Sequence, residues 1–263
     1  MKKYFVIGNP IKHSLSPKLH NHWFRQNNLS DVYDKKLLDE NNLKSFVDDL
    51  RNENIHGANV TVPFKNKIIP FLDEVSETAK KTQSVNTIYL KNKSIIVENS
   101  DVYEFHKSLE LLNYSFKNKS AFIIGAGGVS PSIVQALKIL GLSKIFVTNR
   151  TRAKAEDLIK LFNDIEIVEW GKVVESDIYI NATSIGLNDE DNLEIDFSNI
   201  TNKLFYDVIY SPSKTNFLKN AELKDNVIAN GKMMFLYQAQ AAFKIWTGIE
   251  PKITKIEESL LND

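Results

Sequence analysis

Short apolar runs alternate with segments of helical apolar spacing along most of the 263-residue chain. Residues 121–124 form a short apolar run that fits a strand, whereas Leu43, Phe46, Val47 and Leu50 recur at the spacing of one helix face. In the second half of the chain the two patterns alternate repeatedly. Such alternation is typical of a parallel, doubly wound sheet, so we expect an α/β fold.

These patterns predict the following elements. Strands are expected at 4–7, 32–38, 58–62, 85–90, 94–97, 121–124, 144–148, 164–168, 177–181, 204–209 and 227–229. Helices are expected from 16, over the apolar face 43–50, at 64–72, from 76, at 102–112, from 130, at 151–162 and 213–223, from 231 to about 247, and from 251. The polar segment 113–119 marks the first candidate boundary between domains.

The segment 120–130 joins a strand to a helix through a glycine-rich turn, Gly125-Ala126-Gly127-Gly128. A turn this tight needs residues without a Cβ, and the helix behind it directs free N–H groups at the space above the loop. The pattern approximates a dinucleotide-binding fingerprint that would hold a pyrophosphate, with a plain strand–helix turn as the alternative. Ser130-Pro131 is typical of an N-cap and first helical residue.

The residues after the next strand bear on which dinucleotide is bound. An NAD-binding unit places Asp or Glu about 20 residues beyond the glycines to hold the ribose 2′-hydroxyl. This chain has Asn149, Arg150 and Thr151 there. A guanidinium can pair with a 2′-phosphate, which a carboxylate would repel. The pattern therefore favours NADP, unless Arg150 is simply a solvated residue at a strand end.

Composition narrows the class of protein. The chain is 43% hydrophobic and 25% charged, with zero formal net charge and no cysteine. These values are typical of a soluble globular protein and give no case for a nucleic-acid or membrane partner, a disulfide or a thiolate metal site. The N-terminal apolar run is too short for a signal peptide, so we expect a cytoplasmic protein. The five histidines have no metal-ligand spacing, and we interpret them as structural or solvated.

Polar residues collect where the strands of the first half end. Ser14 and Ser16 follow the first strand, and Lys65 follows the strand 58–62. Asn86 and Asp101 lie near the expected hairpin. Hydroxyl, amide, carboxylate and ammonium groups at strand ends suit a pocket for a hydroxylated substrate. Each has a simpler alternative: Ser16 and Asp101 as helix caps, Ser14 and Lys65 as solvated side chains. Gln238 has one too, as an exposed helix position.

Together these motifs resemble the shikimate dehydrogenase family across nearly the whole chain. The matching segments are Asn9-Pro-Ile, His13-Ser-x-Ser-Pro17, Asn59-Val-Thr-Val-Pro-Phe-Lys65, Val85-Asn-Thr87, Asn99-Ser-Asp101, Gly125-Ala-Gly-Gly128, Asn149-Arg-Thr151, Asn181-Ala-Thr-Ser-x-Gly186 and Gln238-Ala239. The resemblance implies an N-terminal α/β substrate-binding domain, residues 1–101 plus 235–263, to which C-terminal helices return. It also implies a Rossmann-type NADP-binding domain, residues 102–234.

The resemblance further implies reversible, NADP-dependent reduction of 3-dehydroshikimate to shikimate. It assigns catalysis to Lys65 and Asp101. It assigns substrate binding to Ser14, Ser16, Thr61, Asn86, Tyr210 and Gln238. It assigns the cofactor to Gly125, Ala126, Gly127, Gly128, Asn149, Arg150, Thr151, Thr183, Gly231 and Met234, and it implies no metal. The expected partners are small molecules, and the expected state is a monomer or homodimer.

The chain departs from the usual family pattern beside these positions. Gln83-Ser84 replace Gly-Ala before the Val85-Asn-Thr motif, Val102 replaces the glycine after Asp101, and Lys232 stands in the segment usually written Gly-Leu-Gly-Met. Two alternatives to shikimate oxidation remain. One is oxidation of quinate or aminoshikimate, and the other is a non-catalytic NADP-binding regulator, which would not need a proton-transfer lysine.

Overall fold

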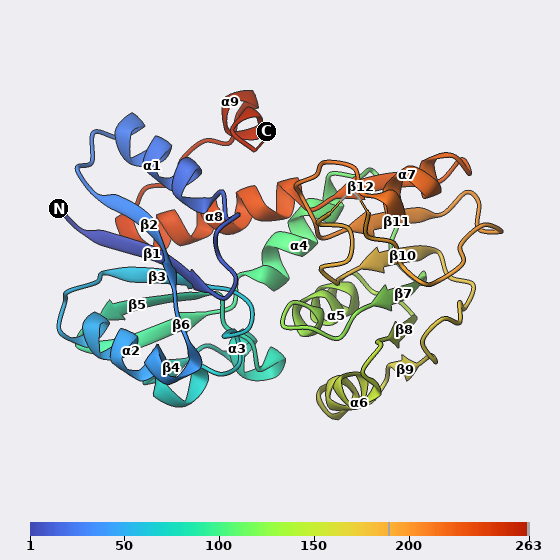
Figure 1. Cartoon of the computed structure of the whole chain (residues 1–263), viewed down its shortest axis with the longest axis horizontal. Coiled ribbons are helices and arrows are strands. Elements are labelled where there is room, and N and C mark those ends of the chain that lie inside the picture. The colour runs from blue at the N-terminus through green and yellow to red at the C-terminus, as the bar shows by residue number, and fades with distance from the viewer. Residues whose placement is uncertain (189, 262–263) are drawn as a thin grey trace. The chain divides into compact units, whose positions relative to one another are not determined.

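A computed structural model describes residues 1–188 and 190–261 of the chain, which divides into two compact units. Unit 1 comprises Met1–Asp101 and Leu236–Leu260, and unit 2 comprises Val102–Phe235 together with Leu261. Each unit is built around its own sheet (Figure 1). The expected α/β fold is confirmed.

The sheet of unit 1 is mixed, with strand order β2-β1-β3-β5-β6-β4. Its strands are β1 (Lys3–Gly8), β2 (Val32–Leu37), β3 (Gly57–Val60), β4 (Glu74–Val75), β5 (Thr87–Lys91) and β6 (Ser94–Glu98). β1 pairs in parallel with β2 and β3, whereas β5 runs antiparallel to both β3 and β6. The expected hairpin therefore forms between β5 and β6.

Helices cover both faces of this sheet (Figure 1). They are α1 (Ser16–Gln26), α2 (Leu43–Arg51), α3 (Glu77–Thr82) and the second half of α8 (Lys232–Thr247), with short 3-10 turns at Glu40–Asn42 and Ile69–Phe71. The last helix, α9 (Lys255–Ser259), contacts α1 through a hydrogen bond between His22 and Glu257. Successive residues of β1 point to opposite faces. Tyr4 stacks on Trp246 of α8, with ring centroids 4.9 Å apart, whereas Phe5 meets Phe46 of α2 edge-on.

His20 of α1 lies fully buried in an aromatic cluster on the α8 face of unit 1. Its ring stacks on Tyr33, with centroids 4.2 Å apart and planes within 7°, and it also contacts Trp23 and Phe243. Because burial disfavours the charged imidazolium, the pKa of His20 falls to about 3. His20 is thus a structural histidine that stays neutral in the folded protein.

The burial of His20 predicts acid sensitivity. The unfolded chain binds a proton at His20 below about pH 6.5, whereas the folded chain does so only near pH 3. Protonation of His20 in the unfolded chain therefore costs the folded protein no stability above pH 6.5, and it lowers the free energy of unfolding progressively as the pH falls toward 3. Between pH 7.5 and 5, this group should lower the free energy of unfolding by about 2 kcal/mol.

Denaturant unfolding at the two pH values measures this loss. A His20→Leu variant should lose about 2 kcal/mol less than the wild type on acidification, and His13→Leu, at an exposed site, should behave like the wild type. Equal acid-induced losses in wild type and His20→Leu would show that His20 titrates normally.

The sheet of unit 2 is parallel throughout, with strand order β12-β11-β10-β7-β8-β9. Its strands are β7 (Ser120–Ile124), β8 (Lys144–Thr148), β9 (Glu166–Ile167), β10 (Ile178–Asn181), β11 (Leu204–Asp207) and β12 (Val227–Asn230). The chain moves outward from β7 through β8 to β9 and then resumes on the other side of β7 at β10. This is the doubly wound arrangement expected from the sequence.

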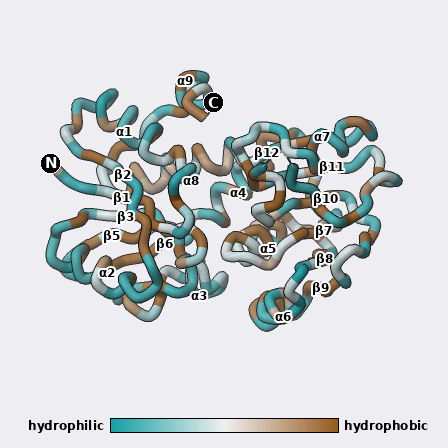
Figure 2. The backbone as a smooth tube through the Cα atoms, in the orientation of Figure 1, coloured by the Kyte–Doolittle hydropathy of each residue, from teal (hydrophilic) through white to brown (hydrophobic). Residues whose placement is uncertain are grey.

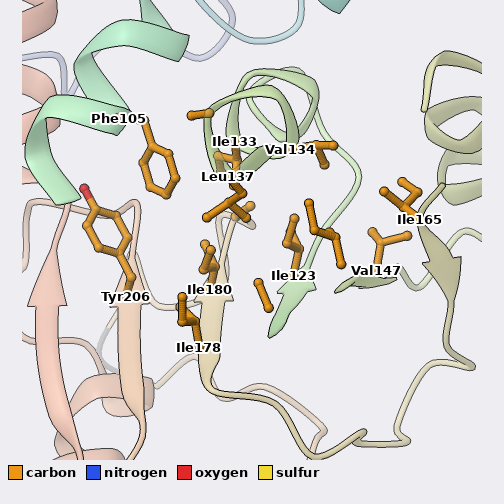
Figure 3. Close-up of a cluster of buried hydrophobic side chains, with 14 of the residues drawn as sticks. Phe105, Ile123, Ile133, Val134, Leu137, Val147, Ile165, Ile178, Ile180 and Tyr206 are labelled. Carbon is orange, nitrogen blue, oxygen red and sulfur yellow. The ribbon is translucent and has the colours of Figure 1, made fainter. Parts of the chain in front are cut away.

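Alternation along the strands builds a core on each face of the unit 2 sheet. The helices of this unit are α4 (Asp101–Glu110, whose first residue belongs to unit 1), α5 (Ser130–Ile139), α6 (Arg152–Leu161) and α7 (Asn216–Glu222). Figure 3 shows Ile133 and Leu137 of α5 over Ile123 and Ile180 of the sheet, with Tyr206 beside Phe105 of α4. Figure 2 shows hydrophobic residues along strands of both sheets and mostly hydrophilic connecting loops.

Several expected elements have different bounds. The strand expected at 164–168 is the two-residue β9, and the helix expected at 213–223 begins later because Thr215 caps α7 by accepting a bond from the Leu218 N–H. The last helix begins not at Pro251 but after Thr254, which forms a capping box with Glu257. Within the described ranges, no helix combines the length and apolarity needed to cross a bilayer.

Candidate active site

Strand directions bring several predicted residues to one edge of the unit 1 sheet. β1 and β3 are parallel, so the segments after Gly8 and Val60 leave from the same edge. β5 begins at this edge and β6 ends there, because each strand is antiparallel to its neighbour. This edge carries the predicted residues Ser14, Ser16, Thr61, Lys65, Asn86 and Asp101.

Lys65 lies in a turn after β3, not in a helix. The helix expected at 64–72 does not form, and only the 3-10 turn Ile69–Phe71 is helical there. Pro70 explains the difference, because proline lacks the N–H that a helix interior requires. The Lys65 carbonyl accepts a hydrogen bond from the Val85 N–H at 2.8 Å, which ties the turn to the segment before β5. The lysine side chain is 9% exposed and pairs with Asp101.

Asp101 is the first residue of α4, with a side chain only 1% exposed. Its Oδ2 atom accepts a hydrogen bond from Lys65 Nζ. Its Oδ1 atom accepts bonds from Asn86 Nδ2 at 2.8 Å and Gln238 Nε2 at 2.9 Å. The carboxylate therefore joins three other predicted residues, Lys65, Asn86 and Gln238, that are distant in sequence. Gln238 is half-buried and bonded, so it is not the exposed helix position that its surroundings also allowed.

Asn86 positions Asp101. The Asn86 side chain is fully buried, and its Nδ2 atom also donates to Ser100 Oγ at 2.9 Å. Its Oδ1 atom accepts a bond from the Ser100 N–H at 3.0 Å. Both ends of this amide thus hold the segment that leads into α4. An ammonium fixed beside a buried carboxylate can donate its remaining protons to a substrate oxygen.

Ser14 and Ser16 lie together in the connection after β1. Their hydroxyl oxygens are 3.2 Å apart, and Ser14 Oγ accepts a bond from the Ser16 N–H at 3.3 Å. Ser16 does not cap α1: the N-cap is Leu15, and no side chain bonds there. Thr61, half-buried, follows β3 and accepts a bond from the Phe64 N–H through its carbonyl. The Ser16 hydroxyl is therefore not used as a cap.

The predicted cofactor residues gather at one edge of unit 2. All of its strands are parallel, so the connections after β7, β8, β10, β11 and β12 leave from the same edge. They carry Gly125 to Gly128, Asn149 to Thr151, Thr183, the predicted substrate residue Tyr210, and Gly231, respectively, and Met234 follows in the first turn of α8. The chain reverses its direction of winding between β7 and β10. Ligands of doubly wound sheets bind at such a point.

The glycine loop after β7 has the geometry that its sequence predicts. Gly125 has φ +110°, and a Cβ there would lie 2.8 Å from the Thr183 methyl group and 3.0 Å from the Ala182 backbone. Gly127 is exposed, and a Cβ there would meet nothing within 4 Å. Gly125 therefore serves the fold, whereas nothing in the fold itself requires Gly127 to be glycine.

Ser130, the first residue of α5, forms hydrogen bonds to the glycine loop and does not cap the helix. The N-cap of α5 is Val129, so the prediction that Ser130 caps the helix is wrong. Ser130 Oγ instead donates to the Gly125 carbonyl at 2.9 Å and accepts from the Gly127 N–H at 3.1 Å. A hydroxyl can do both at once, which suits it to closing a turn.

The segment after β8 divides into a structural and an exposed part. Asn149 Oδ1 accepts a bond from the Ala126 N–H at 3.0 Å, and Asn149 Nδ2 donates to the Thr151 carbonyl at 2.7 Å. Asn149 thereby links the glycine loop to the start of α6. Arg150 and Thr151 are exposed, and Thr151 occupies the N-cap position of α6 without a side-chain bond. An exposed guanidinium at this edge can receive a phosphate.

The remaining predicted residues of unit 2 have distinct surroundings. Thr183 Oγ1 donates to Asn181 Oδ1 at 2.7 Å, and the Tyr210 ring lies 4.4 Å from that of Phe235. Met234 is 7% exposed and belongs to the core. Gly231 is required by space, since a Cβ there would lie 2.1 Å from the Val208 carbonyl oxygen.

Two supporting residues were not singled out from the sequence. Asn59 is buried on β3, where its Oδ1 atom accepts from Tyr33 OH at 2.6 Å and its Nδ2 atom donates to Thr87 Oγ1 and the Asn86 carbonyl, both at 3.2 Å. Asp207, at the end of β11, is also buried. Both residues could have been found from the sequence as polar residues within apolar strands, because such residues fit poorly in a sheet unless they are hydrogen-bonded.

Family models match most of the chain. Residues 6–88 match the shikimate dehydrogenase substrate binding domain. Residues 106–188 match the shikimate/quinate 5-dehydrogenase model, and residues 234–261 match the shikimate 5′-dehydrogenase C-terminal domain.

Individual relatives match over their whole length. A shikimate dehydrogenase (NADP(+)) from Pelagibacter ubique strain HTCC1062 is 52% identical over 264 residues, covering 100% of both chains. The crystal structure of shikimate dehydrogenase from Aquifex aeolicus is 37% identical with a TM-score of 0.92, covering 100% of this chain and 98% of that one. Shikimate 5-dehydrogenase from Thermus thermophilus, in complex with NADP(H) and shikimate, is 28% identical with a TM-score of 0.89, covering 99% of this chain and 98% of that one.

Proposed function

Because the chain belongs to the shikimate dehydrogenase family, we propose that it catalyses the reversible, NADP-dependent reduction of 3-dehydroshikimate to shikimate. This reaction is a step of aromatic amino-acid biosynthesis. The observation that carries the proposal is the buried Lys65–Asp101 pair, braced by Asn86 and Gln238, at the edge where hydroxyl-bearing residues gather. A hydroxylated ring with a reacting carbonyl suits these side chains.

The pair accounts for the protein's part in the reaction. NADPH supplies the hydride when bound. As the hydride reaches the ketone, negative charge builds on the carbonyl oxygen, and the Lys65 ammonium stabilises that charge and delivers a proton. Asp101 keeps the ammonium oriented. Ser14, Ser16 and Thr61 are proposed to bind the polar groups of the ring, as is Tyr210 of unit 2.

The connections of unit 2 suit NADP. The first turn of α5 directs backbone N–H groups toward the space above the glycine loop, where a pyrophosphate can accept them. Gly127 leaves room for a close approach of phosphate to backbone. Arg150 is proposed to pair with the 2′-phosphate, together with Asn149 and Thr151, and Thr183 is proposed to contact the cofactor. Gly231 and Met234 are proposed to lie beside the nicotinamide.

Replacing Gly127 tests this arrangement. A Cβ at Gly127 touches no protein atom, so Gly127→Ala should leave the melting temperature near that of the wild type. The added methyl group would hold the pyrophosphate away from the backbone, so the Kd for NADPH should rise at least about tenfold. Fluorescence titration with NADPH measures the change, and shikimate binding provides the control. An unchanged Kd for NADPH would mean that no phosphate approaches Gly127.

The reaction can be tested in the reductive direction. Purified protein supplied with 3-dehydroshikimate and NADPH should consume both and form shikimate, identified by chromatography against the authentic compound. Consumption of NADPH without shikimate would indicate a different carbonyl substrate. If NADPH binds tightly and no product forms, the protein is a regulator and not an enzyme.

We also propose that this chain works in the cytoplasm, where NADPH and small polar metabolites are available, as a monomer or homodimer without nucleic-acid or membrane partners. Zero formal net charge supports the absence of polyanionic partners. Light scattering during gel filtration would determine the mass in solution, and an assembly larger than a dimer would contradict this proposal.

A further inference from the structure

Asp207 is a buried carboxylate that the proposed reaction does not use directly. It is the last residue of β11 and has no exposed surface. In the sheet it lies between Asn181 at the end of β10 and Asn230 at the end of β12. Burying a carboxylate is costly unless hydrogen bonds compensate, so its surroundings call for an explanation.

Three groups donate hydrogen bonds to the Asp207 carboxylate. Thr215 Oγ1 donates to Oδ2 at 2.6 Å, and the Ile209 N–H donates to Oδ1 at 3.0 Å. Asn181 Nδ2 lies 3.2 Å from Oδ1 and 3.1 Å from Oδ2. Burial raises the pKa of Asp207 to about 6, against the opposing effect of these donors, so the group is ionised at neutral pH. An ionised carboxylate accepts from all of these donors at once, which a neutral amide cannot.

Each partner of Asp207 continues into a connection at the proposed cofactor edge. Asn181 accepts bonds from the Thr183 N–H at 3.1 Å and the Thr183 hydroxyl at 2.7 Å, and it donates to the Ile185 carbonyl at 3.0 Å. The Ile209 carbonyl accepts a bond from the Gly231 N–H at 3.1 Å, and Ile209 immediately precedes Tyr210. One carboxylate thus connects the segments after β10, β11 and β12.

We propose that Asp207 is a positioning residue for the NADP site, holding Thr183 and the segments around Tyr210 and Gly231 in their binding geometry. The inference rests on the proposed function, because that function assigns those residues to cofactor and substrate. Asp207 acts through Asn181 and Ile209 and has no need to contact either ligand. Its partners in the structure all belong to unit 2, whereas the Lys65–Asp101 pair belongs to unit 1.

Asp207→Asn tests the proposal with little change in size. The new amide would turn its N–H groups toward Thr215 or the Ile209 N–H, so at least one of the present hydrogen bonds would be lost or reversed in the interior. We expect the Kd for NADPH to rise about tenfold, and the KM for NADP to rise with it. The Kd for shikimate, measured calorimetrically without cofactor, should rise by less than the Kd for NADPH, because Tyr210 belongs to unit 2 whereas the other proposed substrate residues belong to unit 1. If the role of Asp207 is purely structural, the variant should melt at a lower temperature. Its Kd for NADPH, measured well below that melting temperature, should then equal that of the wild type.

Three further variants serve as a control, a compensating double variant and a substitute for Asp207→Asn. Asp196→Asn removes an exposed carboxylate that accepts from the Ser198 N–H, and it should leave the Kd for NADPH unchanged. Asn181→Asp combined with Asp207→Asn restores a complementary donor and acceptor, so it should recover part of the lost affinity. If Asp207→Asn does not fold, Thr215→Val, which removes one donor, should still weaken NADPH binding by about threefold, or 0.65 kcal/mol.

Wild-type affinity for NADPH in the folded Asp207→Asn protein would overturn the proposal, as it would in Thr215→Val. A wild-type protein that binds NADPH but forms no shikimate would instead contradict the proposed reaction. In that case the NADPH titrations would still decide the role of Asp207.

Discussion

Lys65→Ala should lower kcat for shikimate oxidation about a thousandfold, while the KM for shikimate changes little. The variant removes Lys65, which is proposed both to stabilise the negative charge on the reacting oxygen and to deliver a proton to it. Because these interactions are strongest in the transition state, the loss should appear in kcat. Asp101 keeps its bonds from Asn86 and Gln238, so the fold of unit 1 should persist. Steady-state kinetics and the melting temperature together measure the effect.

Lys67→Ala is a matched control for this prediction. Lys67 lies two residues beyond Lys65 in the same turn region, but its side chain is 42% exposed and pairs with Glu40 at the surface. This variant should retain wild-type kcat, since surface ion pairs contribute little. If the kcat of Lys65→Ala is within a few-fold of the wild-type value, Lys65 is not the proton donor.

Arg150→Ala should raise the KM for NADP by about 10- to 100-fold and leave the KM for NAD unchanged. The guanidinium is exposed at the end of β8, where a charge-assisted bond to the 2′-phosphate would supply the discrimination. NAD has no 2′-phosphate, so its binding should not depend on Arg150. The ratio of kcat/KM values for the two cofactors, at fixed salt, is the quantity to measure.

The control is Lys160→Ala, which removes a cation near the other end of α6. Lys160 is 74% exposed and pairs with Asp157, so its loss should leave both cofactor constants unchanged. If the two variants weaken NADP equally, the effect comes from overall charge. If Arg150→Ala weakens NAD as much as NADP, Arg150 does not contact the 2′-phosphate.

The sequence predicted the strand ends at which the polar residues stand, and strand direction decides which of these ends share an edge. Lys65, Asn86 and Asp101 each stand at an end of a short apolar run, and pairing β3, β5 and β6 brings those ends together. In unit 2 the parallel strands likewise bring the loop of Thr183 to Gly125. Apolar periodicity thus predicted the strand ends, whereas the choice of Lys65 and Asp101 as catalytic residues came from the resemblance to the shikimate dehydrogenase family.

The sequence could not predict what each polar side chain bonds to. Ser130 has the pattern of an N-cap, yet its hydroxyl bonds to the loop before the helix, because the path of that loop decides the nearest partner. Gln238 reaches Asp101 across 137 positions, a contact that no local pattern encodes. The incorrect prediction of a helix at 64–72 has a different cause. Pro70 argues against a helix there, but the prediction gave more weight to the apolar spacing.

Initial rates of cofactor reduction with four combinations, shikimate or quinate with NADP or NAD, test the central claim most directly. The proposed roles of Lys65, Asp101 and Arg150 predict rapid NADPH formation from shikimate and NADP, with much lower kcat/KM for each other pair. Faster oxidation of quinate than of shikimate would contradict the proposed substrate. An equal rate with NAD would contradict the role of Arg150, and tight NADP binding without turnover on either substrate would contradict catalysis itself.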